Sequence, residues 1–290
     1  LTLTLTLTLT LTLTLTWPKD LYTTPLAGKD QLVASTGKAD PDKITLYRQV
    51  LGSLNHLSRW TRPDISLAMS QLGRYQQNPG EYHFNALKRV LGYLWSTRAY
   101  QLSVCKCSTP TLNLYCDADF AGDKDDRKSQ LGYVVMLGDS TITWSSKKQK
   151  SVARNTMEAE YFAASAASAN GMSALFTLQS LKVLPDNALV RLHVDNQAAI
   201  TAIRDGERLD TVRHIEVAYH YARDLFTKGR LHVFYVRSHD NPADILTKGL
   251  AYRAHMECCK LLRIAKIGGV CSPSAAENSQ ALQNGGESAD

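Results

Sequence analysis

Four acidic residues lie at the ends of predicted strands or near the starts of predicted helices: Asp117, Glu160, Asp195 and Asp244. Carboxylates that converge repel one another and are costly to desolvate, so divalent cations normally hold such a cluster together. Oxygen ligands without a His or Cys partner select Mg²⁺ or Mn²⁺ over zinc. Two such ions about 3.5–4 Å apart can activate a water molecule and stabilise the leaving oxygen in phosphodiester hydrolysis. One of these Asp residues alone would suggest a cap or a turn, but all four in this order favour a metal site.

The expected sheet explains why these acids should meet. Strands are predicted at residues 112–117 and 189–195, and if they are parallel neighbours, Asp117 and Asp195 emerge at the same end of the sheet. Glu160 belongs to a helix predicted over residues 156–181, where it heads a face of small residues suited to close packing on the sheet. Glu158 is the competing glutamate, and we prefer Glu160 because its face of the helix is the packed one.

The period of the hydrophobic pattern changes once along the chain. Helical spacing around residues 47–57, 65–75 and 84–95 predicts a small helical unit. After Pro110 the pattern alternates, and strands are expected at 112–117, 132–137 and 141–144. There follow the helix over 156–181, the strand at 189–195, a short helix from Gln197, a helix over 212–228, a strand at 231–236 and a helix from Pro242. This order predicts an α/β fold with a mixed five-stranded sheet flanked by helices.

The chain divides into four segments on these patterns. Residues 1–16 repeat Leu-Thr without a break, a low-complexity stretch to which we assign no function. Residues 17–109 hold the helical unit, and residues 110–250 hold the α/β domain. Residues 251–290 begin as a helix and then become rich in Ser, Ala, Asn and Gly from about residue 271, where we expect disorder.

Composition and charge limit the possible function classes. The chain is 44% hydrophobic and 21% charged, as in soluble globular proteins, and it has neither an apolar run of membrane-spanning length nor a secretory signal, so we expect an intracellular protein with no membrane partner. The six cysteines match neither zinc knuckles nor a disulfide framework. The net charge is +6, and the excess lies in residues 17–111, which hold 12 basic and 6 acidic side chains. Either a polyanion held by the first folded segment and processed by the second, or simply a solvated basic face, would explain this distribution.

A basic cluster precedes the helix of Glu160. It comprises Lys147, Lys148, Lys150 and Arg154. These residues form either a solvated loop or a contact to phosphates beside the metals.

Several motifs resemble the RNase H domain of copia-type retrotransposon polyproteins. They are Tyr115-Cys-Asp117-Ala-Asp119, Trp144-Ser-Ser-Lys-Lys-Gln149, Glu158-Ala-Glu160-Tyr161, Val194-Asp195-Asn196, Arg213-His214-Ile215 and Ala243-Asp244-Ile-Leu-Thr-Lys248. Upstream motifs resemble the end of the reverse transcriptase module, its thumb and connection: Tyr47-Arg-Gln-Val-Leu-Gly52, Thr61-Arg-Pro63-Asp64-Ile65 and Lys88-Arg-Val-Leu-Gly-Tyr-Leu94. The resemblance covers about residues 24–250 and implies an RNase H-like fold preceded by a helical thumb and connection. The polymerase palm with its Tyr-x-Asp-Asp strand is missing from the sequence.

The resemblance implies a divalent-metal-dependent endonuclease that hydrolyses the RNA strand of RNA–DNA hybrids, with two Mg²⁺ or Mn²⁺ ions. Asp117 would bridge both ions, Glu160 and Asp195 would complete one metal site, and Asp244 would complete the other. His239, five residues before the last acid, is a candidate for assisting product release. The expected partners are the hybrid and the remainder of a reverse transcriptase, in the cytoplasm, the nucleus or a virus-like particle.

Two other functions compete with this one. The chain could be a catalytically silent retrotransposon remnant that only binds nucleic acid or folds; the four acids favour the nuclease, whereas the missing palm and the Leu-Thr repeat favour the remnant. An integrase or transposase of the same fold is disfavoured, because its last essential acid is a glutamate on a late helix, whereas here Glu160 is second in order.

Overall fold

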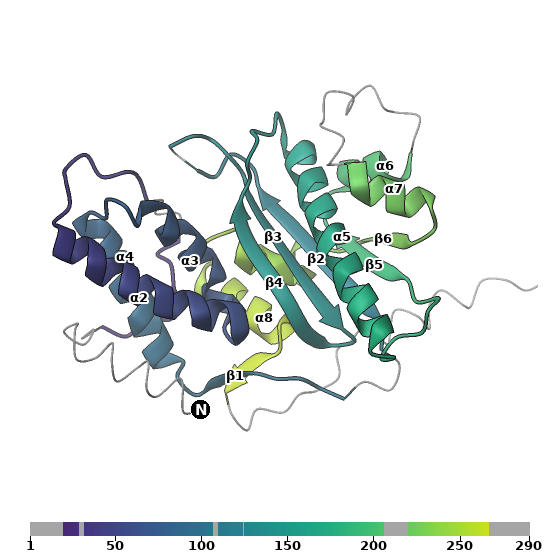
Figure 1. Ribbon diagram of the computed structural model, residues 1–290, viewed down its shortest axis with the longest axis horizontal. Helices are drawn as coiled ribbons and strands as arrows, with labels where there is room; N and C mark the ends of the chain where they lie inside the picture. Colours follow the sequence, from purple (N-terminus) through teal and green to yellow (C-terminus); the bar gives the residue numbers. More distant parts are fainter. Residues whose placement is uncertain (1–19, 29–31, 107–109, 124, 206–219, 267–290) are drawn as a thin grey trace, which may run out of the picture.

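A five-stranded sheet forms the centre of the molecule, between a helical unit on one side and a layer of helices on the other (Figure 1). The computed structural model describes residues 20–28, 32–106, 110–123, 125–205 and 220–266. The strands are β2 (Leu112–Asp119), β3 (Gln130–Leu137), β4 (Ser140–Lys148), β5 (Val190–Val194) and β6 (Leu231–Tyr235). Their order is β4-β3-β2-β5-β6, with β3 antiparallel to both β2 and β4, and with β2, β5 and β6 parallel. The RNase H-like mixed sheet predicted from the sequence is confirmed.

Helix α5 (Thr156–Ser180) packs closely on one face of this sheet. Its small residues bury against β2, and a Cβ added at Gly171 would collide with the side chain of Leu114. Asn155 caps the helix by accepting a hydrogen bond from the backbone N–H of Glu158. Helices α6 (Gln197–Arg204) and α7 (Tyr221–Thr227) pack beside α5. The first part of the helix expected over residues 212–228 lies outside the described residues.

The helical unit has its own core. It consists of α2 (Pro41–Trp60), η1 (Pro63–Ile65), α3 (Ser66–Leu72), η2 (Gly73–Tyr75) and α4 (Glu81–Ser96). The second predicted helix is therefore a short α-helix between two 3₁₀ turns. The first of these turns begins at Pro63, whose fixed φ suits the first position of a helix and whose missing N–H prevents α2 from continuing. Tyr47, Leu54 and Leu72 are fully buried in this core.

The other face of the sheet is covered by the C-terminal part of the chain. The helix expected from Pro242 is only the 3₁₀ turn η6 (Pro242–Leu246), since the backbone N–H of Thr247 bonds Asp244 three residues back. Helix α8 (Tyr252–Leu261) follows, as expected for the segment after residue 250.

Two short strands were missed by the sequence analysis. Strand β7 (Ile264–Lys266) pairs antiparallel with β1 (Tyr100–Leu102), which follows the helical unit. Each is only three residues long, so neither contains enough alternation to predict a strand. Residues from three of the four expected segments thus share one core on this face of the sheet.

Polar contacts join the helical unit to the sheet. The indole N–H of Trp144 donates to the carbonyl oxygen of Ser58 at 2.8 Å, and Arg74 bonds both Asp123 and Gln130 beyond the end of β2 and at the start of β3. Among the described helices, none combines the length and the hydropathy needed to cross a membrane.

Candidate active site

Three of the four acids meet at one end of the sheet. Strands β2 and β5 run parallel with Tyr115 level with His193, and two residues further along each chain come Asp117 and Asp195. One carboxylate oxygen each from Asp117, Glu160 and Asp195 lie within 4.8 Å of one another. Asp117 is fully buried and Glu160 is 4% exposed, so this cluster of charges is largely withdrawn from water.

Glu160 has one satisfied and one unsatisfied oxygen. Its Oε1 accepts a 3.3 Å hydrogen bond from the backbone N–H of Ala118, whereas its Oε2 is buried and has no hydrogen-bond partner among the described residues. Burial raises the pKa of Glu160, and the carboxylates of Asp117 and Asp195 raise it further, to about 9. A cation at this oxygen would satisfy it and would offset the repulsion.

The competing glutamate, Glu158, bonds the backbone before α5 instead of joining the acids. Glu158 Oε2 accepts a 2.9 Å hydrogen bond from the backbone N–H of Arg154, and this contact closes the first turn of α5. The structure therefore brings Glu160, and not Glu158, to the aspartates.

Asp195 is oriented by a residue from the segment that follows β6. The hydroxyl of Ser238 donates to Asp195 Oδ2 at 2.8 Å. Burial raises the pKa of Asp195, and Asp117 raises it further. The carboxylate is thus oriented by Ser238 but remains in an environment that disfavours its charge.

Asp244 joins the cluster through a lysine. The ammonium nitrogen of Lys248 lies 2.9 Å from Asp117 Oδ1 and 2.9 Å from Asp244 Oδ1, and the hydroxyl of Thr247 donates to the other oxygen of Asp117. Burial and Asp117 raise the pKa of Asp244 to about 7, although Lys248 opposes this shift. Burial alone would lower the pKa of Lys248, but the two aspartates raise it on balance, so it remains a cation. The two oxygens of Asp117 are therefore held by two consecutive residues, Thr247 and Lys248.

A glycine allows this segment to approach the sheet. Gly132 on β3 is the cross-strand partner of Asp117, and a Cβ there would lie 2.8 Å from both Leu246 Cβ and Thr247 Cγ2. Asn241 anchors the start of the segment, since its side-chain amide donates to the carbonyl oxygen of Cys116 at 2.8 Å. Any larger residue at position 132 would push Thr247 away from Asp117.

The sequence analysis missed the residues that orient the acids: Ser238, Asn241, Thr247 and Lys248. One signal was available, because Lys248 follows Asp244 by four positions, a spacing that brings opposite charges together over one helical turn. The contacts of Ser238 and Thr247 link residues more than 40 positions apart, and no local pattern encodes them.

Comparisons with known proteins agree with the resemblance seen in the sequence. The chain is 38% identical over 248 residues to the retrovirus-related Pol polyprotein from transposon RE2 of Arabidopsis thaliana, and 36% identical over 249 residues to that from transposon TNT 1-94 of Nicotiana tabacum. These matches cover 86% and 83% of this chain. The chain is a homologue of the copia-type retrotransposon Pol polyproteins. It spans 17% and 18% of the length of these two relatives.

Other comparisons add little to this homology. No protein-family model matches the chain. A solved N-terminal RNase H domain from Mycobacterium tuberculosis, fused to maltose-binding protein, superposes with a TM-score of 0.35 at 14% sequence identity, over 52% of this chain and 98% of that one. The RNase H-like fold class of the Pol homologue rests on its strand order.

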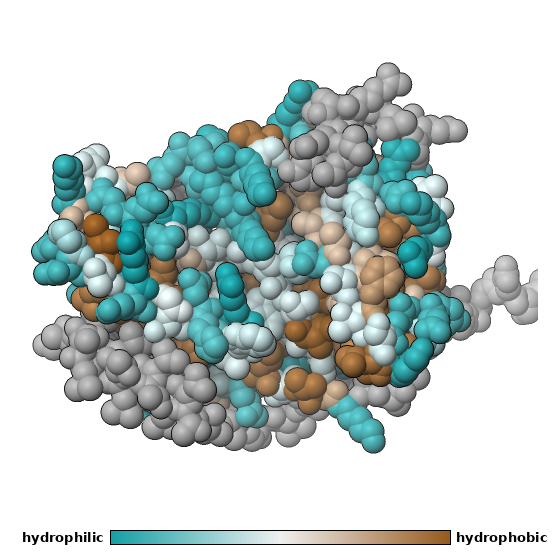
Figure 2. Space-filling view, viewed as in Figure 1, coloured by the Kyte–Doolittle hydropathy of each residue, from teal (hydrophilic) through white to brown (hydrophobic). Residues whose placement is uncertain are grey.

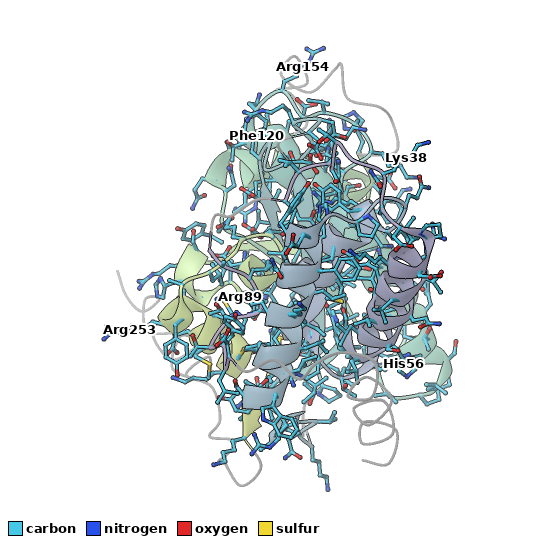
Figure 3. The ribbon with its side chains drawn as sticks, turned by 90° about the vertical axis from the view of Figure 1, so that its left-hand side faces the viewer. Lys38, His56, Arg89, Phe120, Arg154 and Arg253 are labelled. Carbon is cyan, nitrogen blue, oxygen red and sulfur yellow. The ribbon has the colours of Figure 1, made fainter. Side chains whose placement is uncertain are left out.

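The basic cluster of the Pol homologue has one member already engaged. Lys148 pairs with Asp123 at 2.8 Å and with Asp126 at 2.9 Å. Lys147, Lys150 and Arg154 are exposed, and Arg154 is labelled at the upper end of the molecule in Figure 3. Of the four basic residues, Lys148 is therefore held in ion pairs, whereas the other three present their side chains to solvent.

His239 lies at the surface. Its side chain is 70% exposed, and its Nε2 is 3.2 Å from Asp240 Oδ1. It directly follows Ser238, the residue that bonds Asp195.

The donor set of the Pol homologue fits a hard divalent cation. Asp117, Glu160 and Asp195 offer only carboxylate oxygens, they are close together, and one buried oxygen of Glu160 has no hydrogen-bond partner in the part of the chain that the structure describes. Between Asp117 and Asp244, the ammonium of Lys248 provides positive charge.

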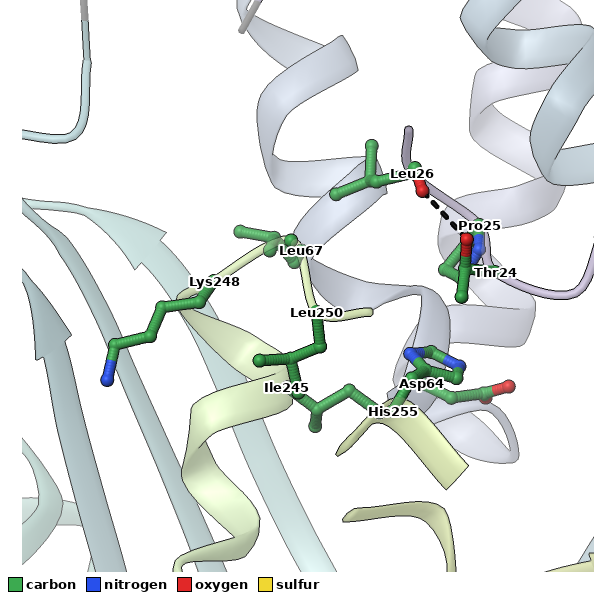
Figure 4. Close-up of a pocket in the computed structure, with 10 residues that line it drawn as sticks. Thr24, Pro25, Leu26, Asp64, Leu67, Ile245, Lys248, Leu250 and His255 are labelled. Carbon is green, nitrogen blue, oxygen red and sulfur yellow. Dashed lines mark hydrogen bonds between the residues drawn. The ribbon is translucent and has the colours of Figure 1, made fainter. Parts of the chain in front are cut away.

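A second group of three potential ligands lies elsewhere, formed by Asp64, His255 and Cys259. Arg62 lies 2.7 Å from Asp64, and the hydroxyl of Tyr93 donates to Asp64 at 2.6 Å and lies 2.9 Å from His255 Nε2. These contacts satisfy Asp64 and His255 without a metal. A small pocket lies beside this group (Figure 4). Asp64, His255 and Lys248 are among the residues that line it, and the side chain of Lys248 extends away from the other two.

Proposed function

We propose that this chain is a divalent-metal-dependent endonuclease that hydrolyses the RNA strand of RNA–DNA hybrids as part of an intracellular reverse transcriptase. The observation that carries this proposal is the convergence of Asp117, Glu160 and Asp195, of which Asp117 and Glu160 are buried and one oxygen of Glu160 has no hydrogen-bond partner among the described residues. Homology to Pol polyproteins supports a nucleic acid as the substrate.

Asp117, Glu160 and Asp195 would hold one Mg²⁺ or Mn²⁺ ion, and Asp117 with Asp244 would hold a second. When bound, such ions activate water and neutralise charge on the leaving oxygen. Every other contribution comes from the protein. The backbone N–H of Ala118 orients Glu160, as Ser238 orients Asp195.

Lys248 has two roles in this proposal. Before the second ion binds, its ammonium keeps Asp117 and Asp244 in position, 2.9 Å from an oxygen of each. With that ion in place, the ammonium would supply a positive charge beside the phosphate that is to be cleaved, where it favours the charge that develops in the transition state.

The hybrid would be held through its backbone. Lys147, Lys150 and Arg154 are placed to contact phosphates, and the basic excess in residues 17–111 gives the helical unit an attraction for the same polyanion. Recognition through the shape and the 2′-hydroxyls of an A-like hybrid requires no base-specific contact. His239, exposed next to Ser238, remains the candidate for product release.

Cleavage of a strand-labelled RNA–DNA hybrid by the full chain tests the proposal. We expect the RNA strand to be cut with Mg²⁺ or Mn²⁺, and cutting to be abolished by EDTA and by Asp117→Asn. Asp186→Asn is the matched control, because Asp186 is 84% exposed in its side chain and pairs only weakly with Lys182 at 3.7 Å. If a folded sample leaves the RNA intact under all these conditions, the nuclease proposal is wrong and the chain is a catalytically silent remnant.

A further inference from the structure

An exposed aromatic ring stands directly beyond the strand that carries Asp117. Phe120 follows the last residue of β2 and is 37% exposed. It lies three residues after Asp117, so its backbone is within about 10 Å of that acid. Large apolar side chains left in water forgo the stabilisation that burial would give them, and this one is presented beside the candidate active site.

The turn that carries Phe120 is firmly held. Ala121 has a φ of 51°, in the left-handed region that residues other than glycine seldom adopt. Its backbone N–H donates to the hydroxyl of Ser129 at 3.2 Å, and Ser129 is fully buried. A Cβ on Gly122 would collide with the carboxylate of Asp119, so the chain folds back tightly against the end of the strand.

A second anchor fixes the same loop. The carboxylate of Asp123 accepts a 2.9 Å hydrogen bond from the backbone N–H of Asp125 and pairs with Lys148 and Arg74. Asp123 is 6% exposed, so this ion pair network is shielded. Phe120 therefore projects from a turn that is tied to both β4 and the helical unit.

A segment with exposed basic residues is tied to the turn that carries Phe120. The carbonyl oxygen of Ser129 accepts a 2.8 Å hydrogen bond from the backbone N–H of Gln149, so Ser129 connects the turn of Phe120 to the segment that carries Lys150. Figure 1 shows both loops emerging at the end of the sheet where α5 begins, and Figure 2 shows a broad hydrophilic surface over that end. Phe120 and Arg154 lie toward this same end in Figure 3. An aromatic ring among exposed cations is the combination that binds nucleic acid, with cations for the phosphates and the ring for the nucleoside.

We propose that Phe120 contacts the nucleoside beside the cleaved phosphate, packing against the ribose and base edge exposed in the shallow minor groove of the hybrid. This inference rests on the proposed function, because it assumes a nucleic acid at the acids. The wide minor groove of an A-like helix exposes sugars and base edges to such a ring. Contacts between one aromatic side chain and a nucleotide contribute roughly tenfold or more to affinity.

The test measures hybrid affinity and cleavage separately. Fluorescence anisotropy of a labelled hybrid, with the full chain carrying Asp117→Asn so that no cutting occurs, should show that Phe120→Ala raises Kd about tenfold. Phe120→Trp should restore affinity to within about threefold of the parent, since any large ring can pack on a nucleoside. Phe176→Ala is the matched control, because Phe176 is 48% exposed on α5 and is not near the acids in sequence.

With Asp117 intact, Phe120→Ala should raise KM and leave kcat within about twofold, because the contact is made equally in the bound and transition states. Equal affinities of the parent and Phe120→Ala would overturn the inference, as would an equal loss in Phe176→Ala. If the chain binds the hybrid but never cuts it, the nuclease proposal fails alone, and the affinity comparison still decides for or against Phe120. If the chain does not bind the hybrid, both are wrong.

Discussion

Two buried acidic clusters in this molecule differ in how their charge is compensated. Near the helical unit, Asp64 is 1% exposed, lies 2.7 Å from Arg62 and accepts a hydrogen bond from Tyr93. Burial acts to raise the pKa of Asp64, but Arg62 and Tyr93 lower it on balance. Glu160 is similarly buried, but its pKa is raised to about 9 and one of its oxygens has no partner among the described residues.

The difference separates a structural cluster from a candidate functional one. Distance alone does not distinguish them, since both groups bring three potential ligands within 4.8 Å. The Asp64 group contains its own cation and its own hydrogen-bond donor, so it is complete in the folded protein. Of the three acids in the Glu160 group, Lys248 contacts only Asp117, and the pKa of Glu160 stays raised, so this group is the candidate for binding a further cation.

The largest expected effect is on the free energy of unfolding when the structural cluster around Asp64 is broken. Asp64→Asn would leave the Arg62 guanidinium buried without a counter-charge, and breaking a buried ion pair in this way costs about 3–5 kcal/mol. Denaturant unfolding of the full chain should show this loss, with exposed Asp186→Asn unchanged. A loss of unfolding free energy below about 1 kcal/mol would mean that Arg62 reaches solvent or another acceptor. Asp64 would then not be the counter-charge that makes its cluster structural.

In the cluster around Glu160, a substitution should reduce activity without reducing stability. Glu160→Gln is expected to reduce hybrid cleavage at least a hundredfold, about 3 kcal/mol of transition-state stabilisation. In EDTA the same change should leave the free energy of unfolding equal or higher, because Gln cannot ionise and so avoids the cost of binding a proton, or of carrying a charge, beside Asp117 and Asp195. Cleavage assays and denaturant unfolding of one preparation measure both. A large loss of stability would show that Glu160 supports the fold rather than a metal.

Acid should weaken the structural cluster through His255. The hydroxyl proton of Tyr93 is donated to Asp64, so the neutral ring of His255 donates to Tyr93 through Nε2. Burial lowers the pKa of His255 from 6.5 to about 4, and although Asp64 opposes this shift, Arg62 adds to it. The unfolded chain therefore binds the proton first, so the stability from neutral His255 is complete above pH 6.5 and is lost as pH falls toward 4.

This loss amounts to about 2 kcal/mol between pH 7 and pH 5. Urea unfolding at the two pH values should show it in the parent chain, and His255→Gln should remove that part of the pH dependence. Tyr93, Cys259, Asp64 and Arg62 face the ring, and burial holds the pKa of Cys259 well above its usual range, so the thiol does not titrate in this interval. An equal pH dependence in His255→Gln would assign it to other groups.

Much of the fold could be predicted from the sequence because its elements are long and regular. The alternation from Leu112 onward and the small-residue face that Glu160 heads identified the central strand and the long helix. The parallel pairing of the first and fourth strands was the condition for the acids to meet, and the structure has it. The three-residue strands β1 and β7 could not be predicted, since they exist only because distant segments of the chain meet.

The acidic residues of the candidate site could be predicted from the sequence, but the hydroxyl and ammonium groups that contact them could not. Asp117 and Asp195 could be identified from their residue type and from their positions at the ends of predicted strands, because functional residues concentrate where strands end and loops begin. The hydroxyl of Thr247 on Asp117, and the ammonium of Lys248 between Asp117 and Asp244, depend on how the turn η6 packs on Gly132. That packing is a tertiary property, and the hydrophobic period gives no information about it.

The smallest expected effect concerns the lysine that partly completes the functional cluster. In EDTA, Lys248→Met should lower the free energy of unfolding by about 1 kcal/mol, because Asp117 and Asp244 lose their shared counter-charge. With Mg²⁺ the loss should shrink, since a divalent cation held by the same acids replaces the missing positive charge. Lys228→Met is the control, because Lys228 forms an exposed pair with Asp224 at 2.8 Å and should show no dependence on Mg²⁺. If Lys248→Met loses the same stability with and without Mg²⁺, the lysine and the metal do not act on the same carboxylates, and Asp244 belongs with the structural acids rather than with Glu160.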